Sequence, residues 1–218
     1  MNHYRLLLVL CLSFGLLVSG AQPATPLMPV TAAAPAPAAD SQTVDLPDLP
    51  AFIRQVANGQ AQQVTGIYVE GVLALPVIQQ PSGQPAYVST APETVTQFSA
   101  ASDFGSLGFL AHNTLAGAHF FDIRVGDLIV LIYGDGHTRS YQVTGLRRFQ
   151  ATHPTSPYSN FIDLDQGGML TYSDLFYQTY GVAGQLVMQT CIAANGNDSW
   201  GRLFVLAMPY VPEPSGAH

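Results

Sequence analysis

The sequence contains no lysine, and all seven of its basic residues are arginines. Against fourteen acidic residues they leave a net charge of −7 at pH 7, with histidine counted as neutral. Such an acidic chain is a poor partner for nucleic acid and is not attracted electrostatically to anionic lipid. Because no single stretch concentrates the charge, we expect a solvated acidic surface.

Cysteine and long apolar runs are also scarce. Cys11 and Cys191 are the two cysteines, and the apolar run Leu6–Val18 has thirteen residues, short of the ~20 that span a membrane as a helix. This run follows an arginine and precedes small residues, which is typical of a secretory signal peptide over residues 1–21; an uncleaved anchor is the alternative. The pattern predicts an exported protein, extracellular or on the outer face of the cytoplasmic membrane. Cys191 would be the only cysteine of the processed chain.

The remainder divides by composition into three parts. Residues 22–49 are rich in proline and alanine and lack aromatic residues, so they cannot bury enough surface to fold and are predicted to form an extended tether. Residues 50–210 contain enough chain for one domain. Residues 211–218 are predicted to be a disordered tail.

Within the domain, short β-rich runs outnumber helices. One helix is predicted around residues 49–59, and a second over residues 172–181, capped by Ser173 and ended by Gly181. The clearest hairpin signal is "YGDGHT" (133–138), because Asp-Gly supplies left-handed turn conformations. Many short strands with few helices predict an all-β barrel or sandwich.

The last two predicted strands, "QLVMQT" (185–190) and "RLFVLAM" (202–208), are joined by a predicted ten-residue loop, Ile192–Gly201. Antiparallel pairing would bring Cys191 and Arg202 to the same edge of the sheet. A neighbouring arginine favours the thiolate, which is the nucleophilic form of cysteine. The alternative is that Cys191 is a small buried apolar residue and Arg202 a surface charge.

A thiol nucleophile needs an imidazole partner. His112 ends a predicted apolar strand, 106–112, and is therefore expected at the same rim as Cys191. His119 is expected to be packed or solvated, and His137 and His153 to be ordinary exposed residues. The fifth candidate, His218, belongs to the tail.

No metal or cofactor is predicted. The spacing of His112, His119 and Asp122 fits no common zinc pattern. Asp163 and Asp165 lie in a predicted turn, where paired acids usually serve turn chemistry rather than calcium binding.

Two segments, 110–149 and 187–207, resemble the sortase family. They contain, in order, a strand ending in histidine, a phenylalanine-containing loop, a Gly-Asp turn into a long hairpin, a strand ending in Thr-Cys, and an arginine that opens the last strand. His112, Cys191 and Arg202 are separated by 79 and 11 residues, similar to the family, and the match covers about residues 64–209. Sortases commonly have glycine where Ala111 stands and Leu-x-Thr-Cys where this chain has "MQTC". These departures leave the sortase class and the sorting motif open.

The resemblance implies a closed β-barrel of about eight strands with a few short helices. It implies a cysteine transpeptidase in which Cys191 forms a thioester with a sorting-signal peptide, His112 transfers protons and Arg202 donates hydrogen bonds to the substrate carbonyl. Thr190 would line the substrate groove, unless it is only a β-branched strand residue. The partners would be a surface protein's sorting signal and a cell-wall or pilin-type amine acceptor, with membrane contact only through the N-terminal segment. The alternative is a non-catalytic extracellular binding module on the same barrel, which burial of Cys191 would favour.

Overall fold

Strands are the main regular element of residues 46–212, the part of the chain that the computed structural model describes. The predicted signal peptide, nearly all of the tether and most of the tail lie outside these residues. No helix among the described residues is long and apolar enough to cross a membrane. In chain order the elements are α1 (Leu49–Val56), β1 (Val64–Val69), β2 (Leu73–Gln79), β3 (Val95–Phe98), α2 (Ser99–Ser102), β4 (Leu107–Leu110), the 3₁₀ helix η1 (Ala116–Phe121), β5 (Leu128–Tyr133), β6 (Thr138–Ala151), β7 (Phe161–Asp163), β8 (Met169–Leu170), α3 (Tyr172–Tyr180), β9 (Leu186–Ala194) and β10 (Asn197–Pro209).

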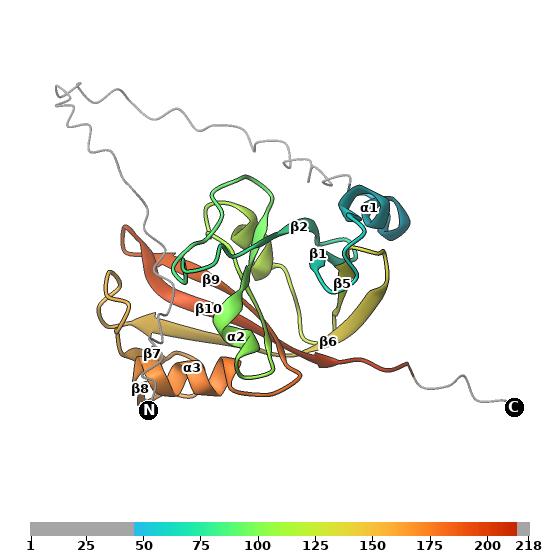
Figure 1. Ribbon diagram of the computed structural model, residues 1–218. Coiled ribbons are helices and arrows are strands. Elements are labelled where there is room, and N and C mark those ends of the chain that lie inside the picture. The colour runs from blue at the N-terminus through green and yellow to red at the C-terminus, as the bar shows by residue number, and fades with distance from the viewer. Residues whose placement is uncertain (1–45, 213–218) are drawn as a thin grey trace, which may run out of the picture. The chain divides into compact units, whose positions relative to one another are not determined.

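The strands close into a barrel. Their order is β10-β9-β4-β3-β2-β1-β5-β6-β7-β8, and β10 also pairs with β6, so the first eight strands of that order form a ring. β7 and β8 continue from β6 outside the ring, and Figure 1 shows them beside α3 on one side of the barrel. The β2–β3 and β4–β9 pairs are parallel, and the other pairs are antiparallel. The predicted all-β fold, a closed barrel of about eight strands with a few short helices, is confirmed.

Apolar side chains pack on both faces of the barrel wall. Because successive strand residues point to opposite faces, Leu186 and Met188 of β9 contribute to the cluster that fills the barrel. Val187 points the other way, into a second cluster with Phe204 of β10 and Tyr180 of α3. The wall formed by β9 and β10 is therefore covered by α3 on its outer face. A covered wall of this kind can bury a polar site.

The two predicted helices are present, with one correction. α1 lies within residues 49–59 as predicted, and Asp48 caps it by accepting a hydrogen bond from the Ala51 N–H at 2.7 Å. α3 is capped by Thr171, not by Ser173. In this capping box the Asp174 N–H donates to the Thr171 hydroxyl, and the Thr171 N–H donates to the Asp174 carboxylate. A cap at Ser173 would start the helix two residues later and would leave these two backbone N–H groups without those partners. Gly181 ends the helix as predicted.

The predicted β5–β6 hairpin is confirmed. Gly136 has φ +88°, the left-handed conformation that glycine adopts without steric cost. The Tyr133 N–H donates to the His137 carbonyl at 2.9 Å and closes the turn.

The predicted ten-residue loop between the last two strands is wrong. β9 continues to Ala194 and β10 begins at Asn197, so the connection is the two-residue turn Asn195-Gly196. Both turn residues have positive φ, 52° and 73°, as an Asn-Gly hairpin turn requires. The register shifts between Asn197 and Gly201, where β10 carries a bulge.

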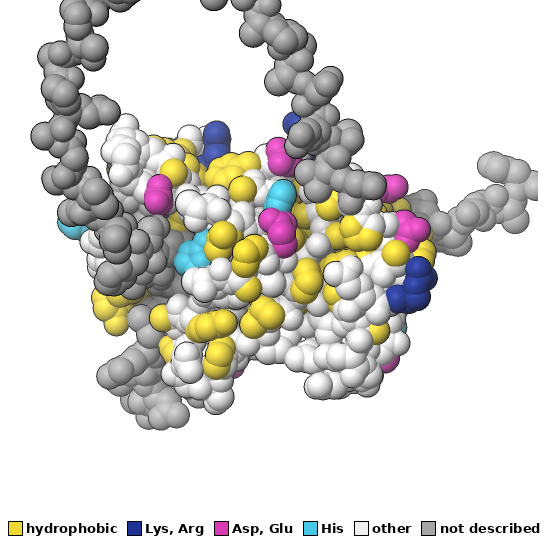
Figure 2. Space-filling view, turned by 90° about the horizontal axis from the view of Figure 1, so that it is seen from above, with side chains coloured by type: hydrophobic (Ala, Val, Ile, Leu, Met, Phe, Trp, Pro, Cys, Tyr) yellow, Lys and Arg dark blue, Asp and Glu magenta, His cyan; other side chains and the backbone are white. Residues whose placement is uncertain are grey.

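Charged side chains are scattered over the surface that Figure 2 shows. Acidic, basic and histidine side chains are interspersed there with apolar and uncharged ones, and none forms a continuous patch of one sign. This distribution agrees with the solvated acidic surface expected from the composition.

Candidate active site

Three adjacent strands bring the candidate catalytic residues side by side. Arg202 of β10 lies directly opposite Cys191 of β9 in the antiparallel register. On the other side of β9, Leu110 of β4 is the parallel partner of Gln189. The last hydrogen bond between the two strands runs from the Ala111 N–H to the Gln189 carbonyl at 3.2 Å, so His112 is the first residue beyond this pairing, at the end of β9 that carries Cys191. β4 ends at Leu110, so His112 lies just beyond the strand rather than at its last residue as predicted.

The three residues belong to the outer face of the barrel wall. Leu110 and Phe204, each two residues from a candidate, are members of the cluster under α3. The Gln189 side chain also reaches that cluster, where it accepts a hydrogen bond from the Tyr180 hydroxyl at 2.8 Å. Strand alternation therefore assigns the candidates to this face.

Arg202 is buried, not a surface charge. Its side chain is 3% exposed, and its Nη1 donates to the carbonyls of Ser199 at 2.9 Å and Gly201 at 2.8 Å. The guanidinium also lies 6.0 Å from the centre of the Phe161 ring. Within residues 46–212 its Nε has no hydrogen-bond partner. A buried donor without an acceptor is costly, and a substrate carbonyl would satisfy it.

Cys191 is fully buried, at 0% exposed, between its neighbours on the barrel wall. Arg202 is its cross-strand partner in the register of β9 and β10. Burial opposes access, because a peptide can reach Sγ only after covering residues move. The position therefore combines a chemical neighbour suited to a nucleophile with the packing of a core residue.

The imidazole of His112 is half-buried. Burial lowers the pKa of His112, and a hydrogen bond with the backbone of Val88 opposes that shift only in part. At neutral pH the ring is therefore predominantly uncharged. A neutral imidazole can accept the proton of a neighbouring thiol.

We predict that this lowered pKa makes stability depend on pH. Unfolded histidine titrates near about 6.5, so as the pH falls from about 7 to 5 the unfolded chain binds a proton before the folded chain does, and the free energy of unfolding decreases. In His112→Gln that component should be missing, so the variant should lose less stability over the same pH range. Urea unfolding at each pH measures it, with the exposed His153→Gln as matched control. An unchanged pH slope in His112→Gln would show that His112 is not the group responsible.

Thr190 does not lie on the outer face of the barrel wall, the face to which Cys191 belongs. It is 1% exposed, and alternation along β9 turns it toward the barrel interior. There its hydroxyl lies against Gly117 of η1 and has no hydrogen-bond partner among the described residues. A role for Thr190 in lining the groove stays a prediction without support from this placement.

Gly117 is predicted to be essential for the packing of η1 on the barrel. A Cβ at this position would lie 2.7 Å from the His112 carbonyl oxygen and 2.8 Å from that of Ala111, and would clash with the Thr190 hydroxyl. Because two of these neighbours are backbone atoms, Gly117→Ala should lower the free energy of unfolding by about 2 kcal/mol or more. Gly145→Ala is the control, since a Cβ there meets nothing within 4 Å. Equal stability of the two variants in urea would contradict the prediction.

His119, His137 and Asp163 have partners close to them. His119 pairs with Glu93 at 3.0 Å, and His137 bonds Asp135 at 2.5 Å while it stacks on a tyrosine ring. Asp163 accepts hydrogen bonds from two backbone N–H groups of its own turn, as predicted for turn chemistry. In the described part of the chain no three His, Cys, Asp or Glu side chains form a group that could hold a metal ion.

Phe161 and Val88 are site neighbours that the sequence did not indicate. Phe161 covers the Arg202 guanidinium from β7, and Val88 contacts His112 from the loop before β3. Neither belongs to a recognisable motif, and each is distant in sequence from the residue it contacts. Phe161 is placed there by the pairing of β7 with β6, and Val88 by the course of the loop between β2 and β3.

No protein-family model and no curated protein matches this chain. Among solved structures it is similar to the lid mutant of sortase C1 from Streptococcus agalactiae, with 12% sequence identity, 75% of this chain and 76% of that chain covered, and a TM-score of 0.44. It is similar to sortase A from Listeria monocytogenes, with 13% identity, 68% and 88% covered, and a TM-score of 0.42. A third is sortase A from Corynebacterium diphtheriae, with 15% identity, 70% and 63% covered, and a TM-score of 0.44. These three solved structures are sortases.

Proposed function

We propose that this chain is a sortase-type cysteine transpeptidase that acts outside the cytoplasmic membrane. The observation that supports the proposal is the register of β9 and β10, in which Arg202 lies opposite Cys191, with His112 just beyond the end of the neighbouring strand β4. A nucleophile, a proton carrier and a fixed hydrogen-bond donor on one face are the groups that acyl transfer requires.

The first half of the reaction forms a thioester. The thiol proton passes to the His112 imidazole, and the thiolate of Cys191 attacks the carbonyl carbon of a threonyl-type residue in an extended sorting signal. A C–S bond forms as the carbonyl becomes an oxyanion, which the Nε–H of Arg202 stabilises; a preorganised donor of this kind contributes on the order of 3 kcal/mol. The imidazolium then protonates the leaving amine as the C–N bond breaks.

The second half transfers the acyl group. An amine of a cell-wall or pilin-type acceptor attacks the thioester carbonyl and gives its proton to His112. The C–S bond breaks, a new amide bond forms, and the cysteine is regenerated. Water in place of the amine gives hydrolysis.

The burial of Cys191 favours a second candidate, a non-catalytic extracellular binding module. A fully buried side chain is what a small core residue would show. In that case the hydrogen bonds from Arg202 to Ser199 and Gly201 would serve to hold the bulge of β10. The two functions differ in whether Sγ ever reaches a peptide.

Capture of an acyl-enzyme tests the choice between them. The full chain would be incubated with a pool of extended threonine-containing peptides, and intact-mass and peptide-mapping spectrometry would locate any added acyl group. The transpeptidase predicts a hydroxylamine-sensitive adduct on Cys191, because hydroxylamine cleaves thioesters. If no peptide adds, and iodoacetamide alkylates Cys191 only in urea, the binding module is the correct function.

A further inference from the structure

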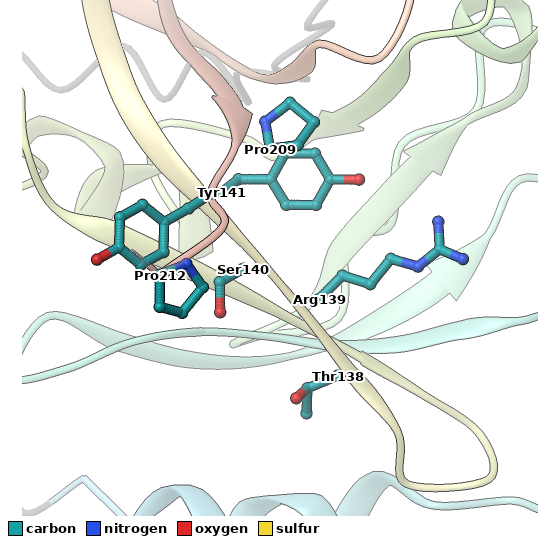
Figure 3. A pocket seen from close by; sticks show the side chains of 7 residues that line it. Thr138, Arg139, Ser140, Tyr141, Pro209 and Pro212 are labelled. Atoms are coloured by element: carbon teal, nitrogen blue, oxygen red, sulfur yellow. The ribbon is translucent and has the colours of Figure 1, made fainter. Parts of the chain in front are cut away.

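A hollow of about 410 Å³ lies between the start of β6 and the end of β10. Figure 3 shows Thr138, Arg139, Ser140 and Tyr141 along β6, with Pro209 at the end of β10 and Pro212 from the segment that follows it. The Tyr210 N–H donates to the Ser140 carbonyl at 2.9 Å and ties the two walls together.

This hollow is remote from the candidate active site. Tyr141 pairs with Pro209, whereas Arg202 pairs with Phe149, eight residues farther along β6. Eight residues of strand correspond to roughly 26 Å. A ligand in the hollow would therefore not contact Cys191.

Arg139 is the only charged residue among those that line the hollow. It is exposed, and within residues 46–212 its guanidinium forms no ion pair, unlike those of Arg147 and Arg148. Its guanidinium carbon lies 5.6 Å from the centre of the Tyr133 ring, which holds the cation at this end of the barrel. In a chain with twice as many acids as bases, an arginine without a carboxylate partner beside a hollow is suited to an anion.

Tyr141 supplies a second donor next to this cation. It lies two residues from Arg139 on β6, on the same face of the strand. The phenol is buried, and burial raises the pKa of Tyr141, while the hydrogen bond with Arg139 opposes the shift. The hydroxyl therefore stays protonated and can donate while its oxygen accepts from the guanidinium.

We propose that this hollow binds a ligand that presents a carboxylate beside an apolar group. Arg139 and the Tyr141 hydroxyl would hold the carboxylate, since a guanidinium and a carboxylate make the strongest hydrogen-bonded pair available here. Pro209, the register partner of Tyr141, and the Tyr141 ring would contact the apolar group. A free peptide C-terminus with an apolar last residue has this chemistry.

N-acetyl-phenylalanine, its amide and acetate are probes that separate these contributions. Titration of the ¹⁵N-labelled full chain, followed by the amide signals of Arg139 and Tyr210, measures binding at the hollow itself. The acid should bind saturably and about tenfold or more tighter than the amide, because only the acid makes a charge-assisted bond. Acetate should also bind more weakly than the acid. Equal binding of acid and amide would overturn the proposed carboxylate contact. Equal binding of acid and acetate would overturn the proposed contact with an apolar group.

Variants then test the assigned residues. Arg139→Gln should weaken binding of the acid about tenfold and leave binding of the amide unchanged, and Tyr141→Phe, which removes only the hydroxyl, should weaken the acid selectively. Arg124→Gln, an exposed arginine outside the hollow, and Cys191→Ala should both bind the acid as the unchanged chain does. Loss of binding in Cys191→Ala, or full binding in a folded Arg139→Gln, would refute the proposal. Under the proposed function Cys191→Ala is inactive, yet it should still bind the acid in this hollow. Activity therefore tests the proposed function, and binding of the acid tests this proposal independently.

Discussion

Replacement of Cys191 by alanine is expected to abolish thioester formation and to slow peptide cleavage at least about ten-thousandfold, since no other group can replace the nucleophile. The register that places Cys191 opposite Arg202 supports this expectation, because the proposed mechanism needs a fixed hydrogen-bond donor beside the nucleophile. Single-turnover cleavage of whichever peptide forms the adduct gives the rate, and mass spectrometry gives the adduct.

The fold should survive this substitution. Cys191 is buried, so Cys191→Ala leaves a small cavity and should cost about 1 kcal/mol of stability, which thermal unfolding would measure. Val187→Ala, which truncates another buried side chain of β9, is the matched control and should retain both cleavage and the adduct. Cleavage at the unchanged rate by a folded Cys191→Ala would exclude the proposed mechanism and leave the binding module.

Arg202→Lys is expected to lower kcat by about 10²–10³, the usual cost of losing one donor to an oxyanion. Because lysine keeps the positive charge, the fall in kcat would come from the different arrangement of its hydrogen-bond donors. The guanidinium uses Nη1 for the Ser199 and Gly201 carbonyls and still has Nε for the substrate, whereas one ammonium cannot occupy both places. Steady-state rates with the captured peptide would show a fall in kcat larger than any rise in KM.

Arg148→Lys is the matched control for this experiment. Arg148 is 58% exposed and pairs with Asp165 on the surface, where exchange of arginine for lysine costs little. Its rate should equal that of the unchanged chain. If Arg202→Lys stays folded and is as active as Arg148→Lys, Arg202 is not the oxyanion donor.

Local turn chemistry explains which connections were predictable. The Asp-Gly turn between β5 and β6 depends on neighbouring residues alone, and Gly136 adopts the left-handed conformation expected there. Asn195-Gly196 has the same kind of signal, but the polar residues around it were interpreted as a long loop. The bulge between Asn197 and Gly201 explains that error, since two extra residues interrupt the alternation that identifies a strand.

The sequence by itself determined the all-β class, and it predicted that Cys191 and Arg202 lie opposite each other, as the register of β9 and β10 shows. The strand ends on which that prediction rested are wrong, because both residues lie inside their strands. These features follow from local propensity and from one short hairpin. Only the tertiary structure decided that Cys191 and Arg202 are buried, that Thr190 faces the barrel interior and that Phe161 covers the guanidinium. The physical reason is that these contacts depend on the parallel pairing of β4 with β9 and on the closure of β10 onto β6. Such pairings join residues far apart in the chain, and no local pattern specifies which strands will meet.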